Sequence, residues 1–168
     1  MNDNNSLEMD KALDKSAFYE GLRDGIPIGL GYFAVAFSLG IAYRNAGITA
    51  FQGFLTSITN ATSAGQFAGA NLIVANGALV ELGLTTLIIN IRYFLMSISV
   101  SQKVEQKMTM KERMAIAFGI TDEIFAVSMQ RDHALTTAYM AGLILTPVVG
   151  WTGGTLVGAV ATSLMPPI

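Results

Sequence analysis

Cysteine is absent from this chain of 168 residues, and His133 is its only histidine. Without thiolates the chain can form no disulfide, and one imidazole cannot supply the roughly four ligands of a structural zinc site. The chain also lacks the Gly-rich loop and lysine of a nucleotide-binding P-loop and the HExxH motif of zinc proteases. These absences exclude an ATP-driven pump and a zinc enzyme, so we expect neither enzymatic activity nor a metal or cofactor.

Charged side chains are scarce as well, at 13% of the sequence, where soluble domains carry about 25%. Nine of them lie before Pro27, and Asn45–Val80 contains none over 36 residues. Such a run is typical of membrane-spanning helices, because about 20 helical residues cross the ~30 Å hydrocarbon layer. The runs are continuous rather than alternating, which argues against a transmembrane β-barrel. A net charge of −2 gives no sign of nucleic-acid binding. The predicted fold class is therefore all-α, a polytopic helical protein of the lipid bilayer.

Hydropathy divides the chain into a polar leader and one transmembrane domain. Residues 1–24 are expected to form a polar tail followed by a short interfacial helix with Ser16 as its N-cap. Residues 25–168 are expected to form the transmembrane domain. Its apolar segments are 25–43, 48–75, 82–101, 114–129 and 134–165.

The second apolar segment has an unusual length and a polar middle. Its 28 residues, 48–75, are too many for one upright helix and too few for two crossings of about 20 residues each. Residues 60–66 are polar, which favours two half-helices that meet there and line a cavity. Basic residues support a re-entrant segment, since the N-terminal flank has three and the 102–113 loop has four, so both should be cytoplasmic. The N-terminal flank and the 102–113 loop can both be cytoplasmic only if the chain between them crosses the membrane an even number of times.

The last apolar segment allows two interpretations. Pro147 and Trp151, with the neighbouring glycines, could break it as the second segment is broken, which would give the inverted repeat of many secondary transporters. Alternatively, Gly150, Gly154 and Gly158 are spaced by four residues and would form one packing stripe on a continuous helix.

Three charged residues lie within the predicted spans. Arg92 sits midway in an apolar helix, where an unpaired cation costs roughly 2.5 to 3.5 kcal/mol on insertion scales. Asp122 and Glu123 are the acids at comparable depth, so we expect Arg92 to pair with one of them. Neighbouring helical residues point about 100° apart, which leaves the other carboxylate free. The pair would either tether two helices or recognise a charged substrate and exchange protons.

Polar residues near these charges predict a pocket at the membrane midplane. Half-helix N-termini aimed at it would offer N–H groups to a carboxylate. Each polar side chain alone could instead make an interhelical hydrogen bond worth roughly 0.6 kcal/mol. The residues predicted to bind substrate are Ser63, Gln66, Asn90, Arg92 and Tyr93. Asp122 and Glu123 are predicted to carry proton coupling or ammonium recognition.

Four motifs occur in a fixed order along the chain. They are Phe18, Gly21, Pro27 and Gly31-Tyr32; Ser63-Ala64-Gly65-Gln66-Phe67; Ile89-Asn90-Ile91-Arg92-Tyr93; and Thr121-Asp122-Glu123-Ile124-Phe125-Ala126. From about Phe18 to its end, the chain resembles the AzlC family, the large subunit of branched-chain amino-acid exporters. Members of that family are typically longer, so the resemblance implies a chain shortened at its C-terminus.

The resemblance implies export of branched-chain amino acids across the cytoplasmic membrane, driven by an ion gradient and assisted by a small hydrophobic AzlD-type subunit. It places Gln66, Asn90, Arg92, Asp122 and Glu123 at the site. We therefore expect a multi-pass transporter subunit of the inner membrane that exports branched-chain or related neutral amino acids with proton coupling. The alternatives are a passive pore and a structural or assembly subunit that transports nothing.

Overall fold

A computed structural model describes residues 3–60, 62–75 and 77–164, and their regular structure is helical apart from one isolated bridge between Val104 and Leu135. This confirms the predicted all-α fold class. The helices are α1 (Asp3–Asn45), α2 (Ala50–Thr59), α3 (Ser63–Val74), α4 (Leu79–Lys103), α5 (Met110–Gly119), α6 (Asp122–Gln130) and α7 (Thr137–Leu164).

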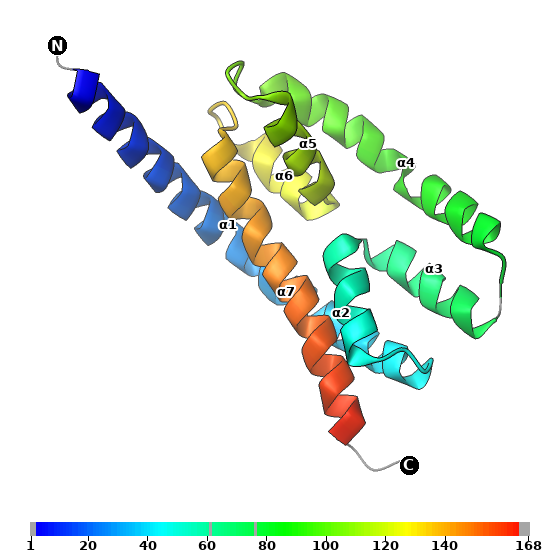
Figure 1. Ribbon diagram of the computed structural model, residues 1–168. Coiled ribbons are helices and arrows are strands. Elements are labelled where there is room, and N and C mark those ends of the chain that lie inside the picture. The colour runs from blue at the N-terminus through cyan, green and yellow to red at the C-terminus, as the bar shows by residue number, and fades with distance from the viewer. Residues whose placement is uncertain (1–2, 61, 76, 165–168) are drawn as a thin grey trace.

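Helices of two kinds alternate along the chain. α1, α4 and α7 are long and apolar enough to cross a membrane. Between them lie two hairpins of short helices, α2–α3 and α5–α6, and each hairpin turns back toward the end of the molecule from which it starts (Figure 1). The described chain therefore combines three potential crossings with two re-entrant hairpins.

The first hairpin lies in the segment predicted to be broken. α2 begins with a capping box in which Thr49 and Gln52 satisfy each other's backbone N–H groups, and it ends at Thr59. α3 begins at Ser63, so the break falls at the start of the predicted polar stretch 60–66. The broken second segment is confirmed.

The second hairpin corrects the prediction of one span over 114–129. α5 also starts with a capping box, from Thr109 and Glu112, and ends at Gly119. The hydroxyl of Thr121 then accepts a hydrogen bond from the N–H of Ile124 and caps α6. A threonine followed by two acids is favourable at a helix N-terminus, because the hydroxyl and the carboxylates complement the first unpaired N–H groups.

The last segment is one continuous helix, and this confirms its interpretation as a packing stripe. α7 runs beside α1, and glycines on both helices bring the two backbones together (Figure 1). A Cβ atom added to Gly154 would lie 2.4 Å from the carbonyl oxygen of Phe33. Pro147 lies inside α7 without ending it. The pattern of a long helix followed by a hairpin recurs in inverted orientation as α1–α3 and α4–α6 (Figure 1). A broken last segment would instead have given a repeat over residues 25–75 and 114–165.

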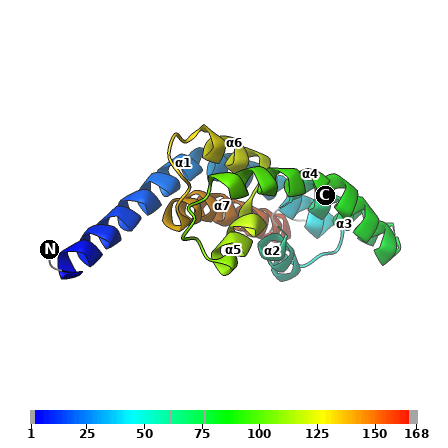
Figure 2. The same cartoon turned by 90° about the horizontal axis from the view of Figure 1, so that it is seen from above.

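The N-terminal residues extend the first span instead of forming a separate element. α1 is continuous from Asp3 to Asn45, so Ser16 lies inside a helix and caps none. Residues 7–15 include two leucines, two lysines, a methionine, an alanine and a glutamate, which favour helix once a neighbouring turn has formed. The start of α1 projects away from the other helices in both views (Figures 1 and 2).

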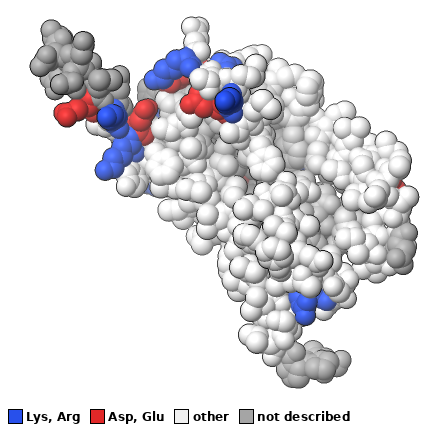
Figure 3. All heavy atoms as spheres, in the orientation of Figure 1, with Lys and Arg blue, Asp and Glu red and all other residues white. Residues whose placement is uncertain are grey.

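Basic residues gather at one end of the molecule (Figure 3). Eight of the 10 lie at the end that holds the start of α1 and the connections α4–α5 and α6–α7. They are Lys11, Lys15, Arg23, Lys103, Lys107, Lys111, Arg113 and Arg131. Arg44 lies at the opposite end, and Arg92 lies between the two ends. The two flanks that were predicted to share one side of the membrane therefore lie at the same end of the fold.

Polar contacts tie the elements together at this basic end. Arg131 makes two hydrogen bonds to the carboxylate of Glu20, at 3.2 and 2.7 Å, and its guanidinium lies 4.0 Å from the ring centre of Tyr139. The hydroxyl of Tyr139 donates to Asp24 at 2.9 Å. The α6–α7 connection and the start of α7 are thus fixed to α1.

Candidate functional site

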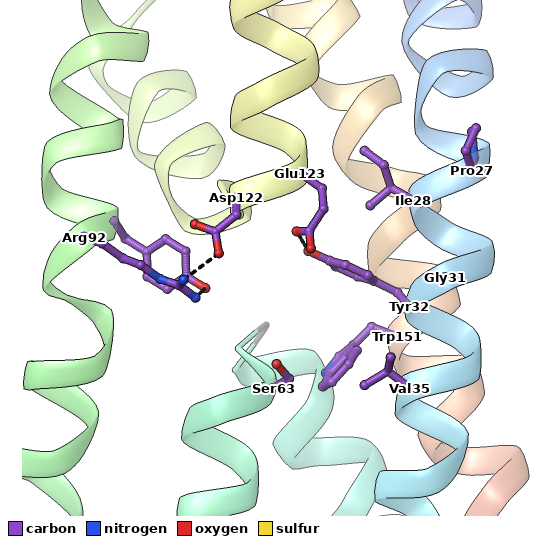
Figure 4. Close-up of a pocket in the computed structure, with 11 residues that line it drawn as sticks. Pro27, Ile28, Gly31, Tyr32, Val35, Ser63, Arg92, Asp122, Glu123 and Trp151 are labelled. Atoms are coloured by element: carbon purple, nitrogen blue, oxygen red, sulfur yellow. Dashed lines mark hydrogen bonds and ion pairs between the residues drawn. The ribbon is translucent and has the colours of Figure 1, made fainter.

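A cavity of about 510 Å³ lies where the tips of the two hairpins meet the long helices (Figure 4). α1 forms one wall, α4 contributes Arg92 and Tyr93, and α7 contributes Trp151. The first residues of α3 and α6 face each other across the space. The lining residues are Pro27, Ile28, Gly31, Tyr32, Val35, Ser63, Arg92, Tyr93, Asp122, Glu123 and Trp151.

Arg92 pairs with Asp122 across this cavity. Its Nη1 lies 2.7 Å from Oδ2 of Asp122, which confirms the predicted ion pair. Its Nη2 lies 3.3 Å from the hydroxyl of Tyr93, and the guanidinium carbon lies 5.0 Å from the centre of that ring. The side chains of Arg92 and Asp122 keep 51% and 45% of their surfaces exposed. The pair is therefore not sealed inside protein, and both charges remain accessible from the cavity.

Glu123 points to a different partner from its neighbour. The hydroxyl of Tyr32 on α1 donates a hydrogen bond to Oε2 of Glu123 (Figure 4). Asp122 and Glu123 thus have separate partners, as the angle between successive helical residues predicted. Both carboxylates lie in the first turn of α6, where the partial positive charge of the helix N-terminus stabilises them.

The start of α3 forms the opposite side of the cavity. Ser63 is its first residue, and the N-cap Thr62 makes no side-chain hydrogen bond to the helix. The hydroxyl of Thr62 donates instead to Oδ1 of Asn90 on α4, at 3.2 Å. The N–H groups of the first turn of α3 therefore have no side-chain cap. Asn90 does not line the main cavity but a smaller one of about 190 Å³ beside the α2–α3 break.

Gln66 is buried in a network away from the main cavity. Only 3% of its surface is exposed, and its Oε1 accepts hydrogen bonds from the hydroxyls of Tyr43 and Ser57, both at 3.1 Å. Its Nε2 donates to the carbonyl oxygens of Asn60 and Thr56. These bonds connect α1, α2 and α3, so Gln66 holds the first hairpin in shape. Of the residues predicted for the site, the structure gathers Ser63, Arg92, Tyr93, Asp122 and Glu123 in one cavity and places Gln66 and Asn90 outside it.

Two aromatic residues of the cavity were not predicted as site residues. Tyr32 and Trp151 pack edge to face, with ring centres 5.8 Å apart. Trp151 is 3% exposed, and its indole Nε1 has no hydrogen-bond partner within the described part of the chain. Both carry a polar group in the middle of an apolar helix, and such a group needs a partner there. Tyr32 and Trp151 could have been found by that signal.

The comparisons with known proteins give one family and two related membrane proteins. A family model described as AzlC protein matches residues 27–165. The chain is 26% identical over 152 residues to "Inner membrane protein YgaZ" of Escherichia coli (strain K12), a match that covers 88% of this chain and 62% of that protein. It is 32% identical over 155 residues to an "Uncharacterized membrane protein" of Archaeoglobus fulgidus, a match that covers 92% of this chain and 67% of that protein. The chain thus spans less than two thirds of the Escherichia coli relative, and no solved structure matches it.

Proposed function

Because the chain belongs to the AzlC family of membrane proteins, we propose that it is a secondary-transporter subunit that exports branched-chain or related neutral amino acids across the cytoplasmic membrane. The basic end of the fold would face the cytoplasm by the positive-inside rule. A small hydrophobic AzlD-type subunit is the proposed partner, on the strength of the family resemblance. Protons are the proposed coupling ion.

One observation carries this proposal: a single cavity combines a cation, two carboxylates, two half-helix N-termini and an apolar wall. A neutral amino acid is a zwitterion with an apolar side chain, so its three parts match these three kinds of surface. The volume of about 510 Å³ falls within the roughly 300–1,000 Å³ of ordinary small-molecule sites. Neither a pore lining nor a purely structural ion pair requires such a combination.

The roles follow from charge. The substrate carboxylate would bind Arg92 or the first-turn N–H groups of α3, and the ammonium group would bind Asp122 or Glu123. Ile28 and Val35 on α1 would contact the aliphatic side chain. Ion pairs and hydrogen bonds of this kind are strengthened when the surrounding medium excludes water.

Proton coupling would use the carboxylate that is not paired with Arg92. Glu123 shares its hydrogen bond with Tyr32, so a proton that arrives at Glu123 changes the link between α6 and α1. In many secondary transporters, one repeat rocks or gates against the other around a site that broken helices form. Alternation of the proton and the ammonium group at Glu123 would then couple substrate release to re-protonation.

Uptake and efflux in proteoliposomes test the proposal. We expect saturable flux and counterflow of labelled leucine, valine and methionine, little flux of glutamate, and stimulation by a pH gradient. The assay should be run with and without the candidate AzlD-type subunit. Flux that rises linearly with concentration and shows no counterflow would indicate a pore. A protein with no flux in either condition, which is needed only for the partner's accumulation in cells, would indicate an assembly subunit.

A further inference from the structure

One side of the cavity carries hydrogen-bond donors that have no acceptor. Trp151 lines the cavity with 3% of its surface exposed, and its Nε1–H finds no partner within the described residues. Buried donors are paired in most native structures, because an unmade hydrogen bond in a low-dielectric interior is costly. We therefore expect the unpaired indole N–H to bind an acceptor that does not belong to the described chain.

Only one other buried side-chain nitrogen or oxygen atom of the described residues lacks a hydrogen-bond partner, and its surroundings explain it differently. The hydroxyl of Thr146 lies at the close contact of α7 with Gly25 on α1, where an added Cβ would come within 2.1 Å of it. Thr146 does not line the main cavity. Packing of two backbones accounts for Thr146, whereas Trp151 borders a space large enough for a ligand.

The start of α3 is a second and independent set of donors on the same side. Ser63 lies on the side of the cavity opposite Asp122 and Glu123, as Trp151 does (Figure 4). α2, α5 and α6 each begin with a threonine whose hydroxyl caps the helix, but Thr62 gives α3 no such cap. The first turn of α3 also contains no acidic residue. Its partial positive charge and free N–H groups are therefore not neutralised by the helix itself.

On the opposite side of the cavity, positive charges already have negative partners. The N-terminus of α6 faces the same space but carries two acids in its own first turn. Arg92 is neutralised by Asp122 at 2.7 Å. The uncompensated positive potential of the cavity thus lies at α3 and Trp151 and not at Arg92.

We propose that the carboxylate of the transported amino acid binds to the Nε1–H of Trp151 together with Ser63 and the first-turn N–H groups of α3. The ammonium group then faces Asp122 and Glu123 across the cavity. This inference rests on the proposed function and chooses between the two carboxylate sites left open there. It makes Trp151 a specificity-determining residue that selects ligands with a free carboxylate.

Trp151 is the only tryptophan of the chain, so its indole resonance reports on the site without assignment. The protein is labelled with ¹⁵N-tryptophan in nanodiscs and titrated with leucine, with 4-methylpentanoate, which lacks the amine, and with 3-methylbutylamine, which lacks the carboxylate. We expect leucine and 4-methylpentanoate to shift the Nε1–H resonance saturably, and the amine to leave it unchanged.

A variant separates the hydrogen bond from the aromatic surface. Trp151→Phe keeps an aromatic ring but removes the N–H, so we expect about a tenfold or greater loss of affinity for leucine and 4-methylpentanoate. The affinity for 3-methylbutylamine should not change. Thr146→Val, which removes the other unpaired donor, is the matched control and should bind all three ligands as the wild type does. Binding of radiolabelled leucine measures these affinities, and circular dichroism confirms that both variants are folded.

Two results would overturn the carboxylate site. One is an indole shift caused by the amine but not by the acid, and the other is an unchanged affinity of Trp151→Phe for leucine. A protein that transports leucine with an unmoved indole resonance refutes this site and leaves the proposed function standing. A protein whose indole responds to 4-methylpentanoate but which moves no amino acid refutes the proposed function and supports the site.

Discussion

At the scale of single residues, Arg92 and Asp122 decide whether the central ion pair is a site or a tether. Arg92→Ala leaves Asp122 unpaired at membrane depth, a loss of roughly 2.5 to 3.5 kcal/mol on insertion scales. We expect lower protein levels and loss of leucine flux. Arg92→Ala combined with Asp122→Ala should restore the protein level, because neither member of the ion pair is then left without its partner, but should not restore flux. Immunoblotting and efflux from the same vesicles measure both quantities.

Arg44, near the C-terminal end of α1, provides a control for these variants. Within the described chain the side chain of Arg44 makes one hydrogen bond, to the carbonyl oxygen of Ile48 at 3.5 Å, and it lies outside the cavity. Arg44→Ala should change neither the protein level nor flux. If the double variant at positions 92 and 122 regains full flux, or if Arg92→Lys transports normally, the pair has no role in substrate binding.

Gln66 gives a second prediction at this scale. Gln66→Leu removes both acceptor and donor from the network that connects α1, α2 and α3, and it leaves the hydroxyl of Tyr43 unpaired. Each buried group left unsatisfied costs about 1–3 kcal/mol, so we expect a lower melting temperature. Ser63→Ala is the comparison, because it alters the cavity without touching this network. A Gln66→Leu protein as stable as the wild type would show that the hairpin does not depend on the network.

These residues also show how far sequence reasoning reaches. The pairing of Arg92 could be predicted, since few charges lie at membrane depth and each must find a partner. The position of Gln66 could not, because its partners come from three helices whose arrangement depends on the turn between α2 and α3. Amide and hydroxyl groups have many acceptable partners, so their sequence positions do not determine which cavity they face.

At the scale of helices, the contact between α1 and α7 depends on glycine at particular positions. A Cβ on Gly154 would lie 2.4 Å from the carbonyl oxygen of Phe33, whereas a Cβ on the adjacent Gly153 would meet nothing within 4 Å. We expect Gly154→Ala to push the helices apart and to lower the melting temperature. Gly153→Ala should be neutral or slightly stabilising, by up to about 1 kcal/mol, because alanine favours helix. Equal effects of the two substitutions would contradict the backbone contact.

The helix boundaries separate what local sequence specifies from what it does not. The polar residues after Thr59 predicted the first break. They indicate a stretch that faces protein or a cavity, and a helix can break only there because lipid cannot satisfy free backbone groups. The second break was missed because Thr121, Asp122 and Glu123 were interpreted as part of one continuous span, in which the two acids were charges at membrane depth. They are equally an N-terminal capping sequence. Pro147 and the nearby glycines suggested a break in α7, but the close packing of α1 keeps that helix continuous.

At the scale of the whole molecule, the two hairpins explain why residues 3–164, apart from the undescribed 61 and 76, hold three helices long enough to cross a membrane and not more. Each hairpin places one half-helix N-terminus at the central cavity, and the two hairpins enter from opposite ends (Figure 1). An inverted repeat was one of two alternatives considered from the sequence, and it depended on a break in the last segment, whereas the repeated unit in the structure is a long helix plus a hairpin. The cavity at its centre needs both units, which is why no single motif could predict its shape.

The absence of cysteine allows this topology to be tested directly. Single cysteines at Asn45 and Ala78, which flank the first hairpin at the end opposite the eight clustered basic residues, should react with a membrane-impermeant maleimide from the same side. Cysteines at Lys107 and Asp132, in the two connections of the basic end, should react only from the other side. A first hairpin that crossed the membrane fully would place Asn45 and Ala78 on opposite sides. The same labelling in right-side-out and inverted vesicles assigns the basic end to the cytoplasm if Lys107→Cys and Asp132→Cys react only in inverted vesicles.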